Sequence, residues 1–222
     1  VDEQGNTLAE PYTIKTPGGN TYTVYPRPIF GYCTPDPVDV DLSVDNPSVT
    51  FIYLDMSHCD PGDTTMIHLT QSYNTPIKPG PYLIGEQMIS RVTLASSGYD
   101  ALIEHPKIVI FYDPSVYDES AIEIPITPGG SVLSYTAKDG MLTINLKPMQ
   151  GGYDIDIPIA WRFKKYVTPE YTPYPLDAFF LNDSNHPLAQ ANQVDFQGYY
   201  PDPYIIKKAN GYQQSGIVLR DF

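Results

Sequence analysis

Cys33 and Cys59 are the residues whose chemistry the sequence defines best, because they are the only two cysteines among 222 residues. If a strand ending at Val44 turns through residues 45–48 and returns from Val49, antiparallel pairing places Cys33 opposite position 60. Cys59 lies one step away, and a bulge could absorb that step and bring the Cα atoms to the roughly 5.5–6 Å that a disulfide needs. We therefore predict a Cys33–Cys59 disulfide, which would add about 3 kcal/mol in the chain-entropy model. Two buried free thiols would explain the same cysteine count.

Carboxylates near the first strands offer the hard oxygen ligands that calcium prefers. They are Asp36, Asp39, Asp41 and Asp45. They do not form a D-x-D-x-D-G loop, and alternation with valines explains Asp39 and Asp41 as the solvated face of a strand. A second group, on a predicted connector, consists of Asp55, His58, Cys59, Asp60 and Asp63. It lacks the paired spacing of zinc ligands, so the sequence predicts no metal site and no cofactor site.

No set of residues indicates catalysis. The histidines are His58, His68, His105 and His186. They are scattered, and no serine lies in a G-x-S-x-G setting that would mark a nucleophile. Glu119 and Glu123 could act as a glycosidase pair, whose carboxyl groups lie about 5–10 Å apart, but at a spacing of four on a predicted strand they would be about 13 Å apart. We interpret them as surface charge and predict that the protein is not an enzyme.

Two covalent cross-links stay open. Cys33 and Gln71 are the residue types that form a thioester, although the helical and aromatic setting of such a glutamine is not evident. An isopeptide bond between a lysine and an asparagine would draw on Lys107, Lys164 and Asn182.

Tyrosines gather toward the end of the chain: Tyr166, Tyr171, Tyr174, Tyr199, Tyr200 and Tyr204. They could form a stacking platform for sugars or a partner peptide. We favour the simpler interpretation that they cover proline-rich loops.

The clearest periodicity lies in residues 140–163. Apolar side chains recur at every second position, at Leu142, Ile144 and Leu146, and again from Tyr153 through Trp161 to Phe163. Period two is typical of strands, and the segment 147–152 between the runs has the composition of a turn. We predict an antiparallel hairpin whose apolar face packs on a second sheet over Trp161. Pro158 cannot donate to a ladder, which places its strand at an edge or a bulge.

Composition supports the same fold class. Because 23 prolines and 16 glycines interrupt the chain, long helices are excluded and an all-β fold is favoured. The net charge of −13 would repel nucleic acid and anionic lipid alike. No apolar run approaches the roughly 20 residues of a membrane span, so we expect either a soluble protein or an internal piece of a longer one.

Further strand candidates follow from alternation and from flanking turn residues. In the first part of the chain they are residues 12–15, 22–25, 38–44 and 49–53. In the second part they are residues 65–71, 88–94, 107–112, 122–126 and 178–181. The spacing of the second group fits an immunoglobulin-like sandwich.

The first part also carries a family resemblance. The order VDEQGNTLAEPYTI, YTVYPRPIFGY and PSVTFIY resembles the MucBP repeat of Gram-positive surface proteins. The matched positions are Asp2, Gly5, Gly31, Tyr32, Val49, Phe51 and Tyr53. The opening strand of the repeat is missing, and Cys33 is not part of its pattern. The resemblance implies a small β-grasp-like module over residues 1–54.

The second part is similar to the DUF11 modules found in tandem on bacterial surface proteins. PGDTTMIHLT and DGMLTINLKPMQGGYDIDIPIAW carry this similarity, with residues 142–144 replacing the usual aromatic strand and residues 150–152 the usual turn. We thus expect a MucBP-like module over 1–54, a connector over 55–61, a sandwich over 62–195, and over 196–222 a linker with the start of a further module.

The two resemblances imply a function. They indicate a non-catalytic fragment of an extracellular, cell-wall-anchored protein that acts as an adhesin or stalk module. Its partners would be a host glycoprotein, mucin or glycan, or neighbouring modules of the same chain, and the fragment itself would be a monomer. The alternative is an accessory glycan-binding module of an extracellular carbohydrate-active enzyme.

Overall fold

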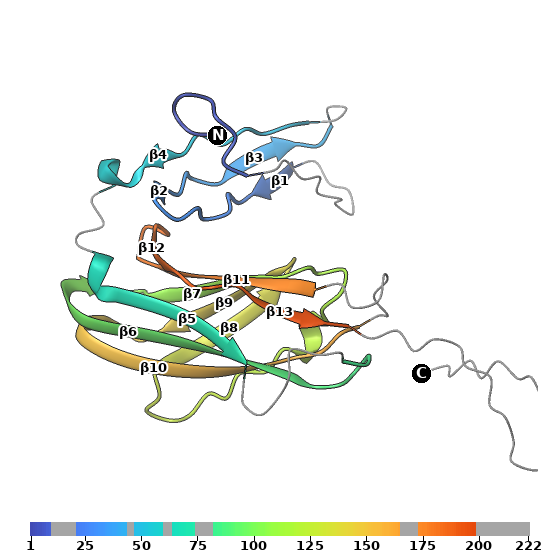
Figure 1. The fold of residues 1–222 in the computed structure, drawn as a ribbon. Helices are drawn as coiled ribbons and strands as arrows, with labels where there is room; N and C mark the ends of the chain where they lie inside the picture. The colour runs from blue at the N-terminus through green and yellow to red at the C-terminus, as the bar shows by residue number, and fades with distance from the viewer. Residues whose placement is uncertain (10–20, 44–46, 60–63, 74–81, 165–172, 199–222) are drawn as a thin grey trace, which may run out of the picture.

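The computed structural model describes residues 1–9, 21–43, 47–59, 64–73, 82–164 and 173–198. It is all-β, and its larger part is a sandwich of two antiparallel sheets (Figure 1). The predicted fold class is therefore confirmed. The predicted strand at residues 12–15 lies outside the described residues.

One sheet of the sandwich has three strands in the order β10, β6, β5. They are β10 (Met149–Trp161), β6 (Met88–Ile103) and β5 (Ile67–Tyr73). The other sheet has six strands, with β12, β11, β7, β9 and β8 in order and β13 paired with the first half of β11. They are β12 (Pro187–Gln190), β11 (Pro173–Leu181), β7 (Lys107–Phe111), β9 (Met141–Leu146), β8 (Val132–Lys138) and β13 (Val194–Gln197).

The core lies between these two sheets. Trp161 is fully buried there, with rings of Tyr112 and Tyr117 edge-on to it at centroid distances of 5.6 and 5.5 Å. Its indole N–H donates to the buried Ser90 hydroxyl at 2.9 Å. The predicted burial of Trp161 is confirmed, and the partner for its N–H explains how a polar atom is accommodated in the core.

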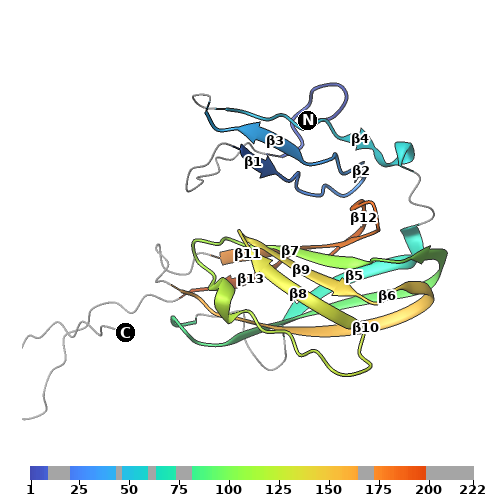
Figure 2. The same ribbon diagram turned by 180° about the vertical axis from the view of Figure 1, so that it is seen from behind.

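The N-terminal segment, residues 21–59, forms two small sheets. β1 (Thr21–Val24) pairs with β3 (Val38–Asp41), and β2 (Tyr32–Cys33) pairs with β4 (Leu54–Asp55). The 3-10 turns η1 (Met56–His58) and η2 (Thr64–Met66) lie on either side of residues 60–63, and η3 (Glu119–Ala121) precedes β8. Both views place this segment beyond the six-stranded sheet, on the side away from the three-stranded sheet (Figures 1 and 2).

The outer face of the six-stranded sheet carries an apolar cluster on that side. Strand alternation turns Ile108 and Ile110 into the core, whereas Val109, Phe179 and Leu181 form a separate buried cluster on the opposite face. We call these three residues the outer cluster. Each of the three side chains is only 3–4% exposed. Side chains on the outer face of a sheet can be this buried only if another segment covers them, and the N-terminal segment lies on that side.

Specific contacts tie the N-terminal segment to this face. The Arg27 guanidinium lies 4.6 Å from the centroid of the Phe111 ring and forms an ion pair with Asp177. The Thr34 N–H donates to His186 Nδ1 at 3.1 Å. Burial lowers the pKa of His186, and the charge of Asp36 opposes that shift in part, so the neutral ring that can accept this hydrogen bond is favoured.

The predicted hairpin over residues 140–163 is wrong. β9 pairs with β7 and β8, whereas β10 pairs with β6, so the two runs belong to opposite sheets. The apolar faces of both runs still point into the core. This follows because the two sheets face each other, so the inner face of each strand is buried whether or not the strands pair. Gly151, with φ of 78°, lies within β10 at a register shift and not in a turn.

Two further strand assignments are also wrong. β3 pairs with β1 and not with residues 49–53, of which only Tyr53 makes a single bridge, to Asp2. The predicted strand over 122–126 is reduced to a bridge between Glu123 and Ala160. Within the described residues, no helix is long and apolar enough to cross a membrane.

Candidate functional site: the groove along the edge of β10

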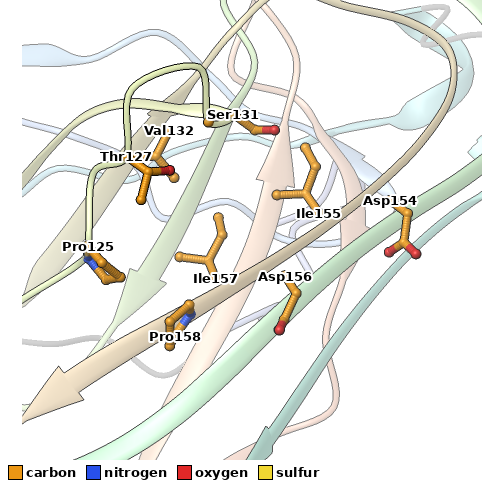
Figure 3. Close-up of a pocket in the computed structure, with 10 residues that line it drawn as sticks. Pro125, Thr127, Ser131, Val132, Asp154, Ile155, Asp156, Ile157 and Pro158 are labelled. Atoms are coloured by element: carbon orange, nitrogen blue, oxygen red, sulfur yellow. The ribbon is translucent and has the colours of Figure 1, made fainter.

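A groove of about 200 Å³ lies beside β10, where the segment leading into β8 passes the edge of that strand. Ile155, Ile157 and Val132 form its apolar wall, and Thr127 and Ser131 line it from the opposite segment. In the close-up, Ile155 and Ile157 point toward Val132 and Thr127, whereas Asp154 and Asp156 lie on the other side of β10 (Figure 3). The groove therefore combines an apolar wall with an acidic rim.

β10 is an edge strand, as its proline predicted. It pairs with β6 on one side, and Pro158 stands opposite Arg91 in that ladder. On its free side, Ala160 exchanges both backbone hydrogen bonds with Glu123, at 2.9 and 3.2 Å. Because backbone direction repeats every second residue, residues 158, 156 and 154 also direct their backbone groups to this free side.

The free edge opens just where the Glu123 bridge ends. Pro158 has no N–H to offer there, but Asp156 and Asp154 each present an N–H and a carbonyl. Among the described residues, no backbone partner is found for these groups. Asp156 also forms an ion pair with Arg91 across the sheet, so Asp154 is the carboxylate of the rim that has no ion-pair partner among the described residues.

The cysteines lie far from this groove, in the N-terminal segment. The Sγ atoms of Cys33 and Cys59 are 2.17 Å apart and the Cα atoms are 5.9 Å apart. The approach does not arise from the predicted register, since Cys33 pairs with Leu54. Instead, η1 turns the chain after β4, and its N-cap Asp55 accepts the Ser57 N–H at 3.0 Å, which carries Cys59 back toward Cys33.

The disulfide can be tested by its thiols. We expect no free thiol when the unreduced protein is titrated in denaturant, and two per chain after reduction. The matched variant Cys33→Ser should show one free thiol and a lower midpoint of unfolding, because the closed loop no longer restricts the unfolded chain. Two free thiols in the unreduced wild-type chain would contradict the disulfide.

The candidate metal ligands serve local structure. Asp39 accepts the Thr23 hydroxyl at 2.6 Å, and Asp41 accepts the Ser43 N–H at 2.8 Å. Hydrogen bonding from the Ser43 side chain, and then from its backbone N–H, lowers the pKa of Asp41. Asp55 caps η1, and its hydrogen bonds with Ser57 lower its pKa. Asp45, Asp60 and Asp63 lie outside the described residues. In the part of the chain that is described, no three His, Cys, Asp or Glu side chains are grouped to hold a metal.

The carboxylate pair proposed from spacing takes a different form. Glu119 lies in η3 and not on a strand, where Oε1 accepts the Tyr112 hydroxyl at 3.0 Å and the Gly140 N–H at 2.8 Å. Burial, and then the hydrogen bond with Glu119, raise the pKa of Tyr112. The backbone N–H and carbonyl of Glu123 are hydrogen-bonded to those of Ala160. Both residues hold the segment before β8 against the core.

Three of the residues considered for cross-links, Cys33, Gln71 and Asn182, are held in other contacts. Cys33 lies against Cys59, whereas the Gln71 amide is buried in the sandwich and donates to carbonyls of Leu176 and Asn192, at 2.8 and 3.1 Å. The thioester pairing is therefore contradicted. Asn182 Oδ1 accepts the N–H groups of Ser184 and His186, at 3.1 and 2.9 Å, and so shapes the turn between β11 and β12.

Of the six late tyrosines, only Tyr174 is described. Its ring packs edge-on against Phe163 at 5.8 Å, and its carbonyl accepts the Tyr117 hydroxyl at 2.7 Å. Tyr174 is thus partly buried against the core, and the other five lie outside the described residues.

No protein-family model matches the sequence, and no curated protein matches it. Among solved structures the chain is similar to BcpA, the major pilin subunit of Bacillus cereus, with a TM-score of 0.44 and 11% identity over 76% of this chain and 52% of the pilin. It is similar to the major pilin SpaD of Corynebacterium diphtheriae, with a TM-score of 0.36 and 12% identity over 76% and 42% of the two chains. It is also similar to a cohesin module of a Clostridium perfringens family 33 glycoside hydrolase, with a TM-score of 0.39 and 10% identity over 60% of this chain and 97% of the cohesin.

The chain thus spans about half the length of the Bacillus cereus pilin. Since these TM-scores lie below 0.5, we base no functional conclusion on them. The MucBP-like and DUF11-like resemblances remain interpretations of the sequence.

Proposed function

We propose that the chain is a non-catalytic β module of a Gram-positive cell-surface protein, extracellular and acting as a stalk or adhesin unit. The observation that supports this most is the close approach of the chain's only two cysteines. Disulfides persist in oxidising, extracellular settings and are rare in the cytosol. The MucBP-like and DUF11-like patterns favour the same setting.

The contacts of the polar side chains support a structural role. Asp183 accepts N–H groups of the turn between β6 and β7, including that of Glu104 at 3.1 Å. The Asn192 amide accepts the Gln71 N–H and donates to its carbonyl, both at 2.9 Å, and so pairs with the edge of β5 as another strand would. These groups fasten loops and sheets to one another, which suits a module that must resist unravelling.

Surface exposure on intact cells tests this proposal. Antibodies raised against residues 64–198 should label intact cells that make the full-length protein, and brief treatment of the cells with protease should remove the signal. A cytosolic protein of the same cells serves as the control and should be labelled only after lysis. Labelling of this chain that also required lysis would overturn the proposal.

A glycan array separates the adhesin role from the stalk role. Selective binding of the purified chain to mucin-type or other glycans would support an adhesin, and absence of binding would leave the stalk. Of the late tyrosines, the described one, Tyr174, packs against the core and so is not free to form a stacking platform; we expect the stalk result.

A further inference from the structure

We propose that the free edge of β10 binds an extended peptide as an added β-strand, and that this peptide alternates aliphatic with basic residues. The inference concerns a binding site and does not depend on where the protein is located. It rests on three features that meet at one place: an unpaired backbone edge, an apolar wall and an acidic rim.

The backbone edge provides the first element of recognition. Asp154 and Asp156 direct their N–H and carbonyl groups away from β6. This direction follows from Ala160, whose backbone hydrogen bonds to Glu123 point away from β6, because every second residue of a strand faces the same side. An added strand would exchange hydrogen bonds with these groups, which is how extended peptides join sheet edges. The Glu123 bridge at Ala160 limits the added strand at one end.

The groove provides the second element. Side chains of an added strand alternate between its two faces. One set would enter the groove of about 200 Å³ and contact Ile155, Ile157 and Val132. Aliphatic residues at these positions would cover the partly exposed Val132 and pack beside Ile155 and Ile157, whose side chains are already buried.

The acidic rim provides the third element and identifies the kind of partner. The other set of side chains would lie on the same face as Asp154 and Asp156, which point away from the groove (Figure 3). Lysine or arginine at these positions would complement Asp154, which has no ion-pair partner among the described residues, and would share Asp156 with Arg91. The chain's charge of −13 would attract a basic peptide from a distance. A second copy of β10 would instead bring like charges together across the new ladder, which is destabilising.

A synthetic peptide tests the proposal directly. The probe is acetyl-Thr-Lys-Val-Lys-Ile-Lys-Thr-amide, and the matched control replaces each lysine by glutamate. We expect the basic peptide to bind the full chain at least tenfold more tightly than the acidic one. Binding should slow amide hydrogen exchange at Asp154 and Asp156, because their N–H groups become paired.

The variant Asp156→Pro removes one outward N–H without removing a bond to β6, just as Pro158 already does in the same strand. We expect it to weaken binding of the basic peptide at least tenfold. Asp156→Asn, which keeps the N–H but loses the charge, should weaken it less. If Asp156→Pro does not fold, hydrogen exchange in the wild-type chain decides instead.

Three results would overturn the proposal. They are equal binding of the basic and acidic peptides, unchanged exchange at Asp154 and Asp156 in the presence of the basic peptide, and self-association of the chain through β10 without any peptide.

Discussion

Replacing Trp161 by alanine should lower the free energy of unfolding by about 3–5 kcal/mol, the cost typical of removing a large buried aromatic side chain. Trp161 is fully buried, and its ring touches the rings of Tyr112 and Tyr117 between the two sheets. The cavity would lie between the two sheets of the larger core, on β10, which pairs with β6 from Met149 to Trp161. Urea unfolding followed by circular dichroism measures the loss.

Trp161→Phe is the matched control. It keeps an aromatic ring but removes the N–H that donates to Ser90 at 2.9 Å, so we expect a smaller loss of about 1–2 kcal/mol. The wild-type protein should also emit at a shorter wavelength than indole in water. A Trp161→Ala variant within 1 kcal/mol of wild type, or wild-type emission like that of free indole, would contradict the assignment of Trp161 to the core.

The sequence predicted side-chain faces better than strand partners. Alternation correctly placed Leu142, Ile144 and Leu146 on a buried face, since burial of a face depends only on period two. It could not distinguish a hairpin from a crossing between sheets, because both bury the same face. Pro158 predicted an edge for a local reason, the missing N–H, and this prediction is confirmed.

Long-range features lay beyond the sequence argument. β8 was missed because it is an edge strand with mostly exposed or half-exposed residues, so its apolar period is weak. The groove beside β10 depends on where residues 125–131 cross that strand, and the roles of Glu119 depend on a 3-10 turn. In the sequence, Ile108, Val109 and Ile110 form a continuous apolar run and not an alternating pattern. Such a run is typical of a strand that is covered on both faces, as β7 is.

Because β7 is buried on both faces, cutting the chain at the predicted connector, residues 55–61, should expose one of these faces. We expect the fragment 62–198 to unfold cooperatively, because both sheets of the sandwich lie within it. It should also self-associate and bind the dye ANS, because removing the N-terminal segment uncovers the outer cluster of Val109, Phe179 and Leu181. Size-exclusion chromatography and dye fluorescence, each compared with the full chain, measure this.

The double variant Phe179→Ser, Leu181→Thr separates exposure of the outer cluster from general unfolding. In the fragment it should restore a monomer that does not bind the dye. In the full chain it should instead cost about 3–6 kcal/mol, at about 1.5–3 kcal/mol for each buried side chain, since there the cluster is covered. A fragment without a cooperative transition would show that the boundary is misplaced. A fragment that unfolds cooperatively, stays monomeric and does not bind ANS would show that the N-terminal segment does not cover this face.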